Sequence, residues 1–182
     1  MRSVGMACAA LLAATYAAAA PGGDAPRLKD AADRFYRAYL RARQGGVPVG
    51  YDLARYRAVV SEGLFTLLER AGAAEAEYAR RTHNESPPLI EGDLFTSLFE
   101  GATRYHVDEC RANGDGGTCR VSLAHGEPGG RKPVEWTDTV VLTKESGGWR
   151  VSDVEFGGTW EFMHAGRLVG VLESAIAASK GP

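Results

Sequence analysis

Apolar residues recur at helical spacing near the start of the chain. Leu28, Phe35 and Tyr39 fall on one face, and arginines lie on the opposite face. The pattern predicts an amphipathic helix from about residue 26 to residue 43, which a pair of glycines then ends. The row of arginines is typical of a solvated helix face, although it would also suit an acidic partner.

A second helical region follows the two glycines. Asp52 is suited to cap a helix, and Ser61 is suited to restart it after a kink, so that the helix continues to about Arg81. A pair of prolines then breaks the helix. Beyond the prolines, Asp93 is placed to cap a short helix over residues 94–100.

From residue 103 the apolar positions alternate with a period of two, which is typical of half-buried strands. Glycine-rich turns separate the alternating segments, so we expect consecutive strands to pair as antiparallel hairpins. After the strands, Leu168 and Leu172 mark the apolar face of a last short helix. The predicted strands cover residues 103–111, 118–125, 134–143 and 148–157.

The order of these elements predicts the fold class. N-terminal helices followed by a meander of about four antiparallel strands indicate an α+β fold and not a parallel α/β sheet. The chain has 182 residues, so a single α+β domain over residues 27–178 accounts for most of it.

Residues 1–20 have the features of a secretory signal peptide. Arg2 supplies a positive charge, an apolar run continues to Ala20, and small residues precede Pro21. A transmembrane anchor is the weaker alternative, because the run is rich in alanine and hardly long enough to span a bilayer. We therefore predict cleavage, a flexible leader over residues 21–26, and a secreted or periplasmic protein without membrane insertion after cleavage.

The composition and the missing motifs exclude several functions. The 21 basic and 23 acidic side chains give a formal charge of -2, so the chain lacks the basic excess that nucleic-acid binding needs. The sequence also lacks a Walker loop, a dinucleotide fingerprint, a serine-hydrolase elbow and an H-E-x-x-H motif. We therefore expect no cofactor and no bound metal.

Cys110 and Cys119 flank a strong turn signal. A turn centred between residues 114 and 115 places the two cysteines opposite each other, and facing cysteines join in an oxidising compartment. A redox or metal pair is the alternative, but the spacing is not that of a C-x-x-C motif and no further residues complete a zinc set. We predict a structural disulfide between them.

The C-terminal half resembles a family of bacterial secreted domains, with the pattern W-x-D-x-V-x-L followed by G-x-W-x-V-x-D-[VI]-x-[FY]-G. A similar F-Y-x-x-Y-L segment occurs at residues 35–40. The resemblance implies a nuclear transport factor 2-like cone, in which helices pack over a curved antiparallel sheet and leave a pocket between them. It implies no reaction and no catalytic residues, and the cysteine-bearing hairpin is not part of the pattern. The matching residues are Trp136, Asp138, Val140, Leu142, Gly148, Trp149, Val151, Asp153, Val154, Phe156 and Gly157.

The last predicted hairpin gathers three carboxylates. A tight turn would place Val140 opposite Asp153, and Asp138 opposite Glu155. The cluster would suit a pocket in which one carboxyl group has a raised pKa and acts as a general base or binds a cation. The favoured alternative is a partly exposed face whose acids pair with arginines, because ion pairs also gather carboxylates. A bulge near Ser152 would reconcile the apolar patterns of the two faces.

Two other positions are candidates for a pocket. Tyr105 and His106 lie on the first predicted strand, where His106 shares a face with Asp108 and could take part in proton transfer. A lone histidine on a strand is more often structural or exposed. Trp136 could form a pocket wall, although such residues more often belong to the core.

These observations predict a non-catalytic binding module for a small molecule or an envelope protein. The alternative is a cofactor-free enzyme for proton transfer or hydrolysis that uses Asp138 and Asp153, with His106 as a third candidate. The enzyme requires that these groups converge in one pocket. The predicted ligand-binding residues are Tyr105, Trp136, Asp138, Asp153 and Glu155.

Overall fold

The computed structural model describes residues 23–42, 45–126, 129–130, 132–160 and 166–181. The predicted signal peptide and the first two residues of the predicted leader lie outside this part of the chain. Among the described residues, no helix combines the length and the apolar character that crossing a membrane requires.

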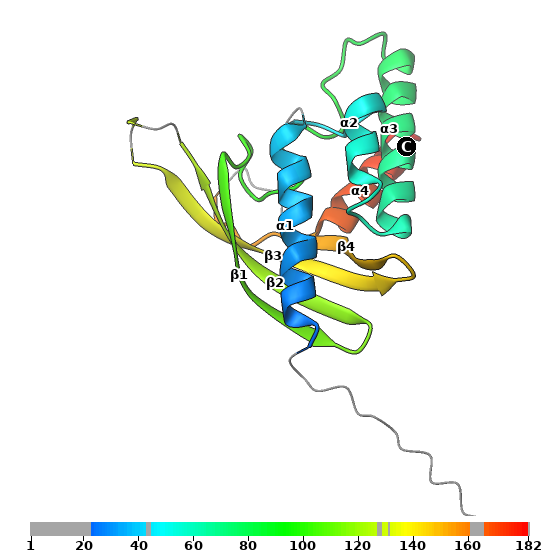
Figure 1. Cartoon of the computed structure of the whole chain (residues 1–182). Coiled ribbons are helices and arrows are strands. Elements are labelled where there is room, and N and C mark those ends of the chain that lie inside the picture. Colours follow the sequence, from blue (N-terminus) through cyan, green and yellow to red (C-terminus); the bar gives the residue numbers. More distant parts are fainter. Residues whose placement is uncertain (1–22, 43–44, 127–128, 131, 161–165, 182) are drawn as a thin grey trace, which may run out of the picture.

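The structure confirms the α+β class, because helices come first, an antiparallel meander follows, and one more helix ends the domain (Figure 1). All four predicted strands are present and differ from their predicted bounds by at most a few residues. The elements are α1 (Ala25–Arg41), α2 (Gly50–Tyr56), α3 (Glu62–Arg81), β1 (Arg104–Asn113), β2 (Gly116–His125), β3 (Val134–Glu145), β4 (Gly148–Glu155) and α4 (Leu168–Ala178).

Helix α1 starts at Ala25, one residue before the predicted start, and its predicted apolar face is buried. Pro26 lies in its first turn, where a proline costs no hydrogen bond because the first N–H groups of a helix are unpaired anyway. Ala25 and Pro26 therefore belong to the helix and not to the leader. On the apolar face, Leu28, Phe35 and Tyr39 are buried against the sheet and the other helices.

The arginine row of α1 is largely neutralised within the helix. Arg34 pairs with Asp30, and Arg37 pairs with Asp33, each one turn earlier in the helix. Such i,i+4 pairs on an exposed face stabilise a helix by a few tenths of a kcal/mol. The contacts agree with the prediction of a solvated face.

The second helical region divides where the sequence predicts. Helix α2 begins at Gly50, which is earlier than expected. Asp52 therefore lies in the first turn of the helix and does not cap it. Ser61 caps α3, and its hydroxyl accepts a hydrogen bond from the N–H of Leu64 at 3.2 Å. Just before this cap, Val60 bridges to Val151, so the kink between the helices also covers the outer edge of β4.

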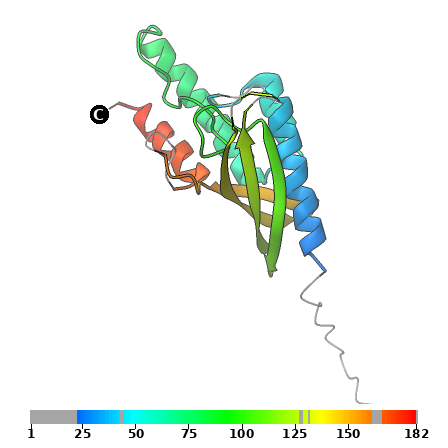
Figure 2. The ribbon, with the colours of Figure 1, turned by 90° about the vertical axis from the view of Figure 1, so that its left-hand side faces the viewer.

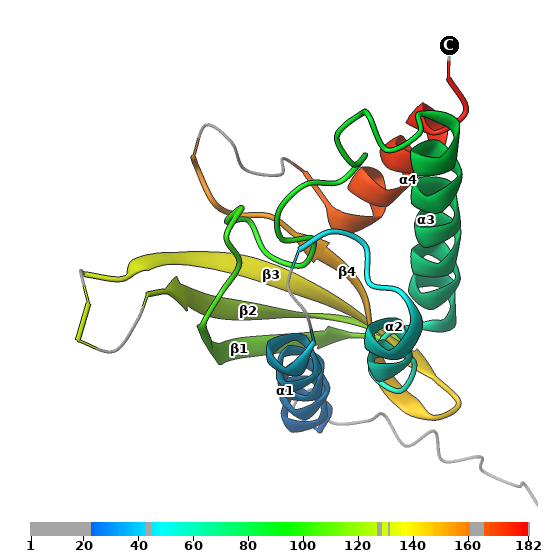
Figure 3. The same cartoon turned by 90° about the horizontal axis from the view of Figure 1, so that it is seen from above.

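The strands form one antiparallel sheet in the order β1-β2-β3-β4. Helix α1 crosses one face of the sheet, and α3 and α4 pack together beside β4 (Figures 1 and 3). The side chains on the α1 side of the sheet are mostly apolar and buried, as the period of two predicts, with Asp138 as a buried charged exception. Val107, Val121, Val140 and Val154 form successive parts of this covered face.

The first hairpin confirms the predicted cysteine pair. Cys110 and Cys119 are partners in the register and are joined by a disulfide. The register shifts between Val107 and Cys110, so one extra residue forms a bulge in β1. This bulge changes which residues of β2 lie opposite the first half of β1.

The last hairpin also contains a bulge. Leu142 faces Val151 as predicted, and the register then shifts, so that Val140 faces Val154. Ser152 is the unpaired residue between the two registers, which confirms the predicted position of the bulge.

The shifted register contradicts two predicted pairs of the last hairpin. Asp153 lies opposite Val141 and not opposite Val140, and Glu155 lies opposite Thr139 and not opposite Asp138. The tight-turn register fails because one inserted residue moves every later partner to the other face of the sheet.

The short helix predicted after Asp93 does not form. Asp93 does act as a cap, since its Oδ1 accepts hydrogen bonds from the N–H of Phe95 at 3.0 Å and of Thr96 at 2.7 Å. The next N–H, that of Ser97, donates to the Asp138 side chain at 2.9 Å instead of continuing the turn. A long-range hydrogen bond therefore prevails over the local helix signal.

The disulfide is expected to stabilise the domain by about 2–3 kcal/mol, because it closes a loop of roughly ten residues in the unfolded chain. The double variant Cys110→Ala with Cys119→Ala should lose this stability in urea unfolding. The reduced wild-type chain should unfold at the same urea concentration as the variant, and reductant should not change the variant. An unfolding midpoint that reduction leaves unchanged in the wild type would contradict the prediction.

Candidate functional site

The face of the sheet opposite α1 is open. No described helix crosses it, and Figure 2 shows the strands on the side facing the viewer. The exposed residues on β1, β2 and β3 alternate with the buried residues of the covered face. The sheet therefore presents a polar surface on one side and a filled core on the other.

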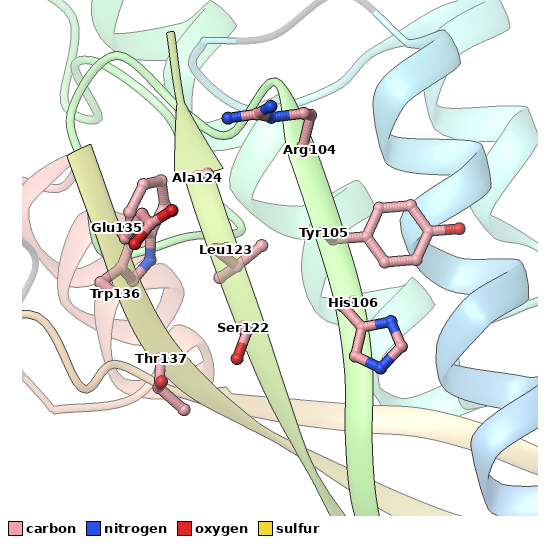
Figure 4. A pocket seen from close by; sticks show the side chains of 9 residues that line it. All are labelled: Arg104, Tyr105, His106, Ser122, Leu123, Ala124, Glu135, Trp136 and Thr137. Atoms are coloured by element: carbon pink, nitrogen blue, oxygen red, sulfur yellow. The ribbon is translucent and has the colours of Figure 1, made fainter. Parts of the chain in front are cut away.

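A groove of about 530 Å³ lies on this open face, at the end of the sheet where β1 begins (Figure 4). Its floor is β2, which carries two small side chains there, Ser122 and Ala124. Longer side chains on the two neighbouring strands form the walls. These are Arg104 and His106 on β1, and Glu135 and Thr137 on β3.

The register of the sheet arranges these residues in two rows across the strands. Arg104 is the partner of Ala124, and Ala124 is the partner of Glu135. Neighbouring strands lie roughly 4.8 Å apart, so the Cα atoms of Arg104 and Glu135 are about 10 Å apart across a methyl group. The second row, two residues further along the strands, consists of His106, Ser122 and Thr137.

The two walls of the first row carry opposite charges. Among the described residues, the Arg104 guanidinium and the Glu135 carboxylate have no ion-pair partner, and both side chains are exposed. In contrast, the third row of the same face is neutralised, because Arg120 lies 3.9 Å from the Asp108 carboxylate. Among the described charged residues that line the groove or lie in its third row, the two without an ion-pair partner are therefore those that flank Ala124.

His106 is not arranged as a catalytic base. Its Nε2 lies 3.9 Å from Asp108 Oδ1, and the Ser122 hydroxyl donates to Asp108 Oδ2 at 2.8 Å. The carboxylate thus lies between the serine and the histidine, whereas a hydrolase needs the histidine to accept the serine proton. The three residues form a surface cluster in which Ser122 donates a hydrogen bond to Asp108, and they are not arranged as a catalytic triad.

Tyr105 borders the groove but directs its side chain toward α1 (Figure 4). Its hydroxyl donates to Asp33, at 3.2 Å to the backbone oxygen and 2.9 Å to Oδ1, and its ring stacks on Tyr36 at 5.2 Å between centroids. Burial and the Asp33 hydrogen bond raise the pKa of Tyr105 to about 12. The phenol therefore stays protonated and holds α1 against β1.

Asp138 is buried behind the groove with all its acceptor positions in use. Oδ2 accepts from Trp136 Nε1 at 3.1 Å and from the Ser97 N–H at 2.9 Å. Oδ1 accepts from the Ser97 hydroxyl and from the Gly157 N–H. A carboxylate with four donors and 1% exposure is held in place by the fold and has no free lone pair for a substrate.

Asp153 and Glu155 lie elsewhere, beside the start of α4. Arg167 lies 3.4 Å from Asp153 Oδ2 and also pairs with Glu155. Asp153 Oδ1 accepts from the N–H of Val169 at 3.0 Å, so this carboxylate joins β4 to the first turn of α4. Neither residue shares a hydrogen-bond partner with Asp138 among the described contacts. The geometry favours ion pairs over a common carboxylate pocket.

The space between the helices and the sheet, which a cone would leave as a pocket, contains aromatic rings. Phe95 enters it from the loop after Asp93, with its ring centroid 4.7 Å from Tyr56 and 5.6 Å from Phe35. The Tyr36 hydroxyl is also buried there and has no hydrogen-bond partner among the described residues. Burial, followed by the charges of Asp138 and Asp93, raises the pKa of Tyr36.

Asp93 is a buried carboxylate that the sequence indicated only as a cap. It is 2% exposed, it hydrogen-bonds the Tyr39 hydroxyl, and its Oδ1 binds two backbone N–H groups. The Tyr39 hydroxyl in turn accepts from the N–H of Ala102 at 2.7 Å. Burial outweighs the hydrogen bonds and raises the pKa of Asp93 to about 6.

The sequence did not indicate Arg104, Ala124 or Glu135 as site residues. The register that the cysteines predict places Arg104 opposite His125, and the bulge in β1 moves it to Ala124. The sequence does contain a signal for this site, namely a small residue, Ala124, on a strand whose two neighbours carry the charged residues Arg104 and Glu135. Of the predicted site residues, the groove includes Tyr105, His106 and Trp136. No cluster of three metal-ligating side chains occurs among the described residues.

Asp138→Asn should destabilise the chain by about 2–4 kcal/mol, because one amide NH2 would face two hydrogen-bond donors. Ser97→Ala is the matched control. It removes one hydroxyl and should cost about 1 kcal/mol. Urea unfolding measures both values. Equal costs for the two variants would show that the carboxylate is not the centre of this network.

Asp93 should make the stability depend on pH. Between about pH 4 and pH 6, the folded chain keeps a proton on Asp93 that the unfolded chain has released. The free energy of unfolding should therefore fall by about 2 kcal/mol between pH 4.5 and pH 8, because the full shift of about two pKa units corresponds to about 3 kcal/mol and part of that loss occurs below pH 4.5. Asp93→Asn should remove this part of the dependence in urea unfolding from pH 4.5 to pH 8. A variant with the wild-type slope would contradict the assignment.

Comparison with protein-family models, with curated proteins and with solved structures finds no match to this chain.

Proposed function

We propose that the chain is a non-catalytic binding module for a small polar molecule, and that the groove over Ser122 and Ala124 is its ligand site. The observation that carries the proposal is the row of Arg104, Ala124 and Glu135, in which two charges without an ion-pair partner among the described residues face each other across a methyl group. Ligand sites combine a concave shape with a few polar groups, and about 530 Å³ is within the usual range for small ligands.

Binding is favoured over catalysis by the contacts of the candidate catalytic residues. Asp138 uses its acceptor positions within the fold, and Asp153 joins β4 to α4. His106 is exposed and faces Asp108 at a distance too long for a hydrogen bond. The required convergence of these three groups in one pocket is not supported, so the enzyme remains the weaker alternative.

We further propose a nuclear transport factor 2-like cone and a secreted or periplasmic location. The cone is supported by helices packed over one face of an antiparallel sheet. The location is supported by the Cys110–Cys119 disulfide, because such bonds persist in oxidising compartments. The exposed residues that the structure describes on the open face are mostly polar, which favours a small ligand over an envelope protein as the partner.

Ala124→Trp should abolish ligand binding, because the indole would fill the floor of the groove without changing a core residue. Thr118→Trp is the matched control, since it is exposed on the same strand and the same face, outside the groove. Saturation-transfer NMR with a mixture of amino acids, small peptides, sugars, organic acids and amines measures the binding.

At least one component should bind the wild type and Thr118→Trp, and should bind Ala124→Trp at least tenfold more weakly. Equal binding to both variants, or binding by no component, would overturn the proposed site. Conversion of a component by the wild-type chain would overturn the non-catalytic assignment.

A further inference from the structure

We infer that the groove takes a zwitterion of about dipeptide size, with its carboxylate at Arg104 and its ammonium group at Glu135. This inference rests on the proposed function and names the class of ligand for the same groove. Such a ligand would meet the charges of the first row, the hydrogen-bonding groups of the second row and the paired charges of the third row.

Arg104 and Glu135, at the two ends of the first row, favour a small ligand that carries opposite charges at its two ends. A guanidinium offers two parallel N–H groups that match a carboxylate, and the Glu135 carboxylate accepts the N–H groups of an ammonium. A ligand with a single charge would leave the opposite wall unmatched. A zwitterion seated on Ala124 would satisfy both walls together.

The second row sets the length of the ligand. His106, Ser122 and Thr137 lie two residues further along their strands, which is about 7 Å from the first row. Their imidazole and hydroxyl groups can donate and accept hydrogen bonds without requiring a further charge. A free amino acid reaches only the first row, whereas the peptide group of a dipeptide can also hydrogen-bond to the second row.

The third row, which contains Asp108 on β1 and Arg120 on β2, marks the far end of the site. Arg120 Nε lies 3.9 Å from Asp108 Oδ2, so the two charges neutralise each other and offer no unmatched charge to a ligand. Asp108 also accepts the Ser122 hydroxyl at 2.8 Å, which fixes this end of the groove floor. At one end of the groove, two charges have no ion-pair partner among the described residues, and at the other end the two charges are paired with each other.

Three peptides of similar size test the inference on the full chain. Glycylglycine carries both charges, N-acetylglycylglycine carries only the carboxylate, and glycylglycinamide carries only the ammonium group. In amide NMR titrations, glycylglycine should shift the signals of the two groove rows. Each capped peptide should bind at least tenfold more weakly than glycylglycine.

Two variants assign the charges to their walls. Arg104→Gln should bring the affinities of glycylglycine and glycylglycinamide within twofold of each other, because the carboxylate would then lose its partner. Glu135→Gln should do the same for glycylglycine and N-acetylglycylglycine. Arg70→Gln and Glu85→Gln remove exposed charges of the same kinds at positions that do not line the groove, and should leave all three affinities unchanged.

The outcomes separate this inference from the proposed function. If the capped peptides bind as tightly as glycylglycine, or if the two variants do not change the preference, the zwitterion is overturned. If glycylglycine causes no shifts in the groove but another component of the mixture binds there, the ligand class is wrong and the binding site stands. If no compound binds in a way that depends on Ala124, both proposals fail.

Discussion

One end of the fold depends on the hydrogen bonds that the buried carboxylate of Asp138 accepts. This carboxylate joins three segments that are distant in sequence, through Ser97 in the loop, Trp136 on β3 and Gly157 after β4. A buried carboxylate is costly unless it is hydrogen-bonded, and here four donors offset that cost. The same four contacts keep this group from acting as a base, so stability and reactivity exclude each other at this position.

Two bulges determine what the sheet presents on each side. The bulge between Val107 and Cys110 sets Arg104 opposite Ala124, and thereby places both charged walls beside the small floor of the groove. The bulge at Ser152 turns Asp153 away from the carboxylate cluster and toward α4. In both hairpins, one irregular position changes the chemistry of a whole face, because side chains alternate along a strand.

The two faces of the sheet consequently have different roles. On the covered face, Phe95 and the tyrosines of α1 fill the space in which the cone resemblance implies a pocket. The open face keeps polar side chains that no described element covers. A ligand site on the open face is compatible with a rigid core behind it, in which Trp136 donates a hydrogen bond to Asp138.

The sequence by itself determined the features that depend on neighbouring residues. The order of helices and strands, the cap at Ser61, the glycine-rich turns and the pairing of Cys110 with Cys119 all follow from local propensity or from one short turn. Tertiary structure alone decided the loop after Asp93, the partners of each carboxylate and the groove on the open face. These features depend on strand register and on hydrogen bonds between distant segments, which compete with local signals and prevail when they satisfy buried polar groups.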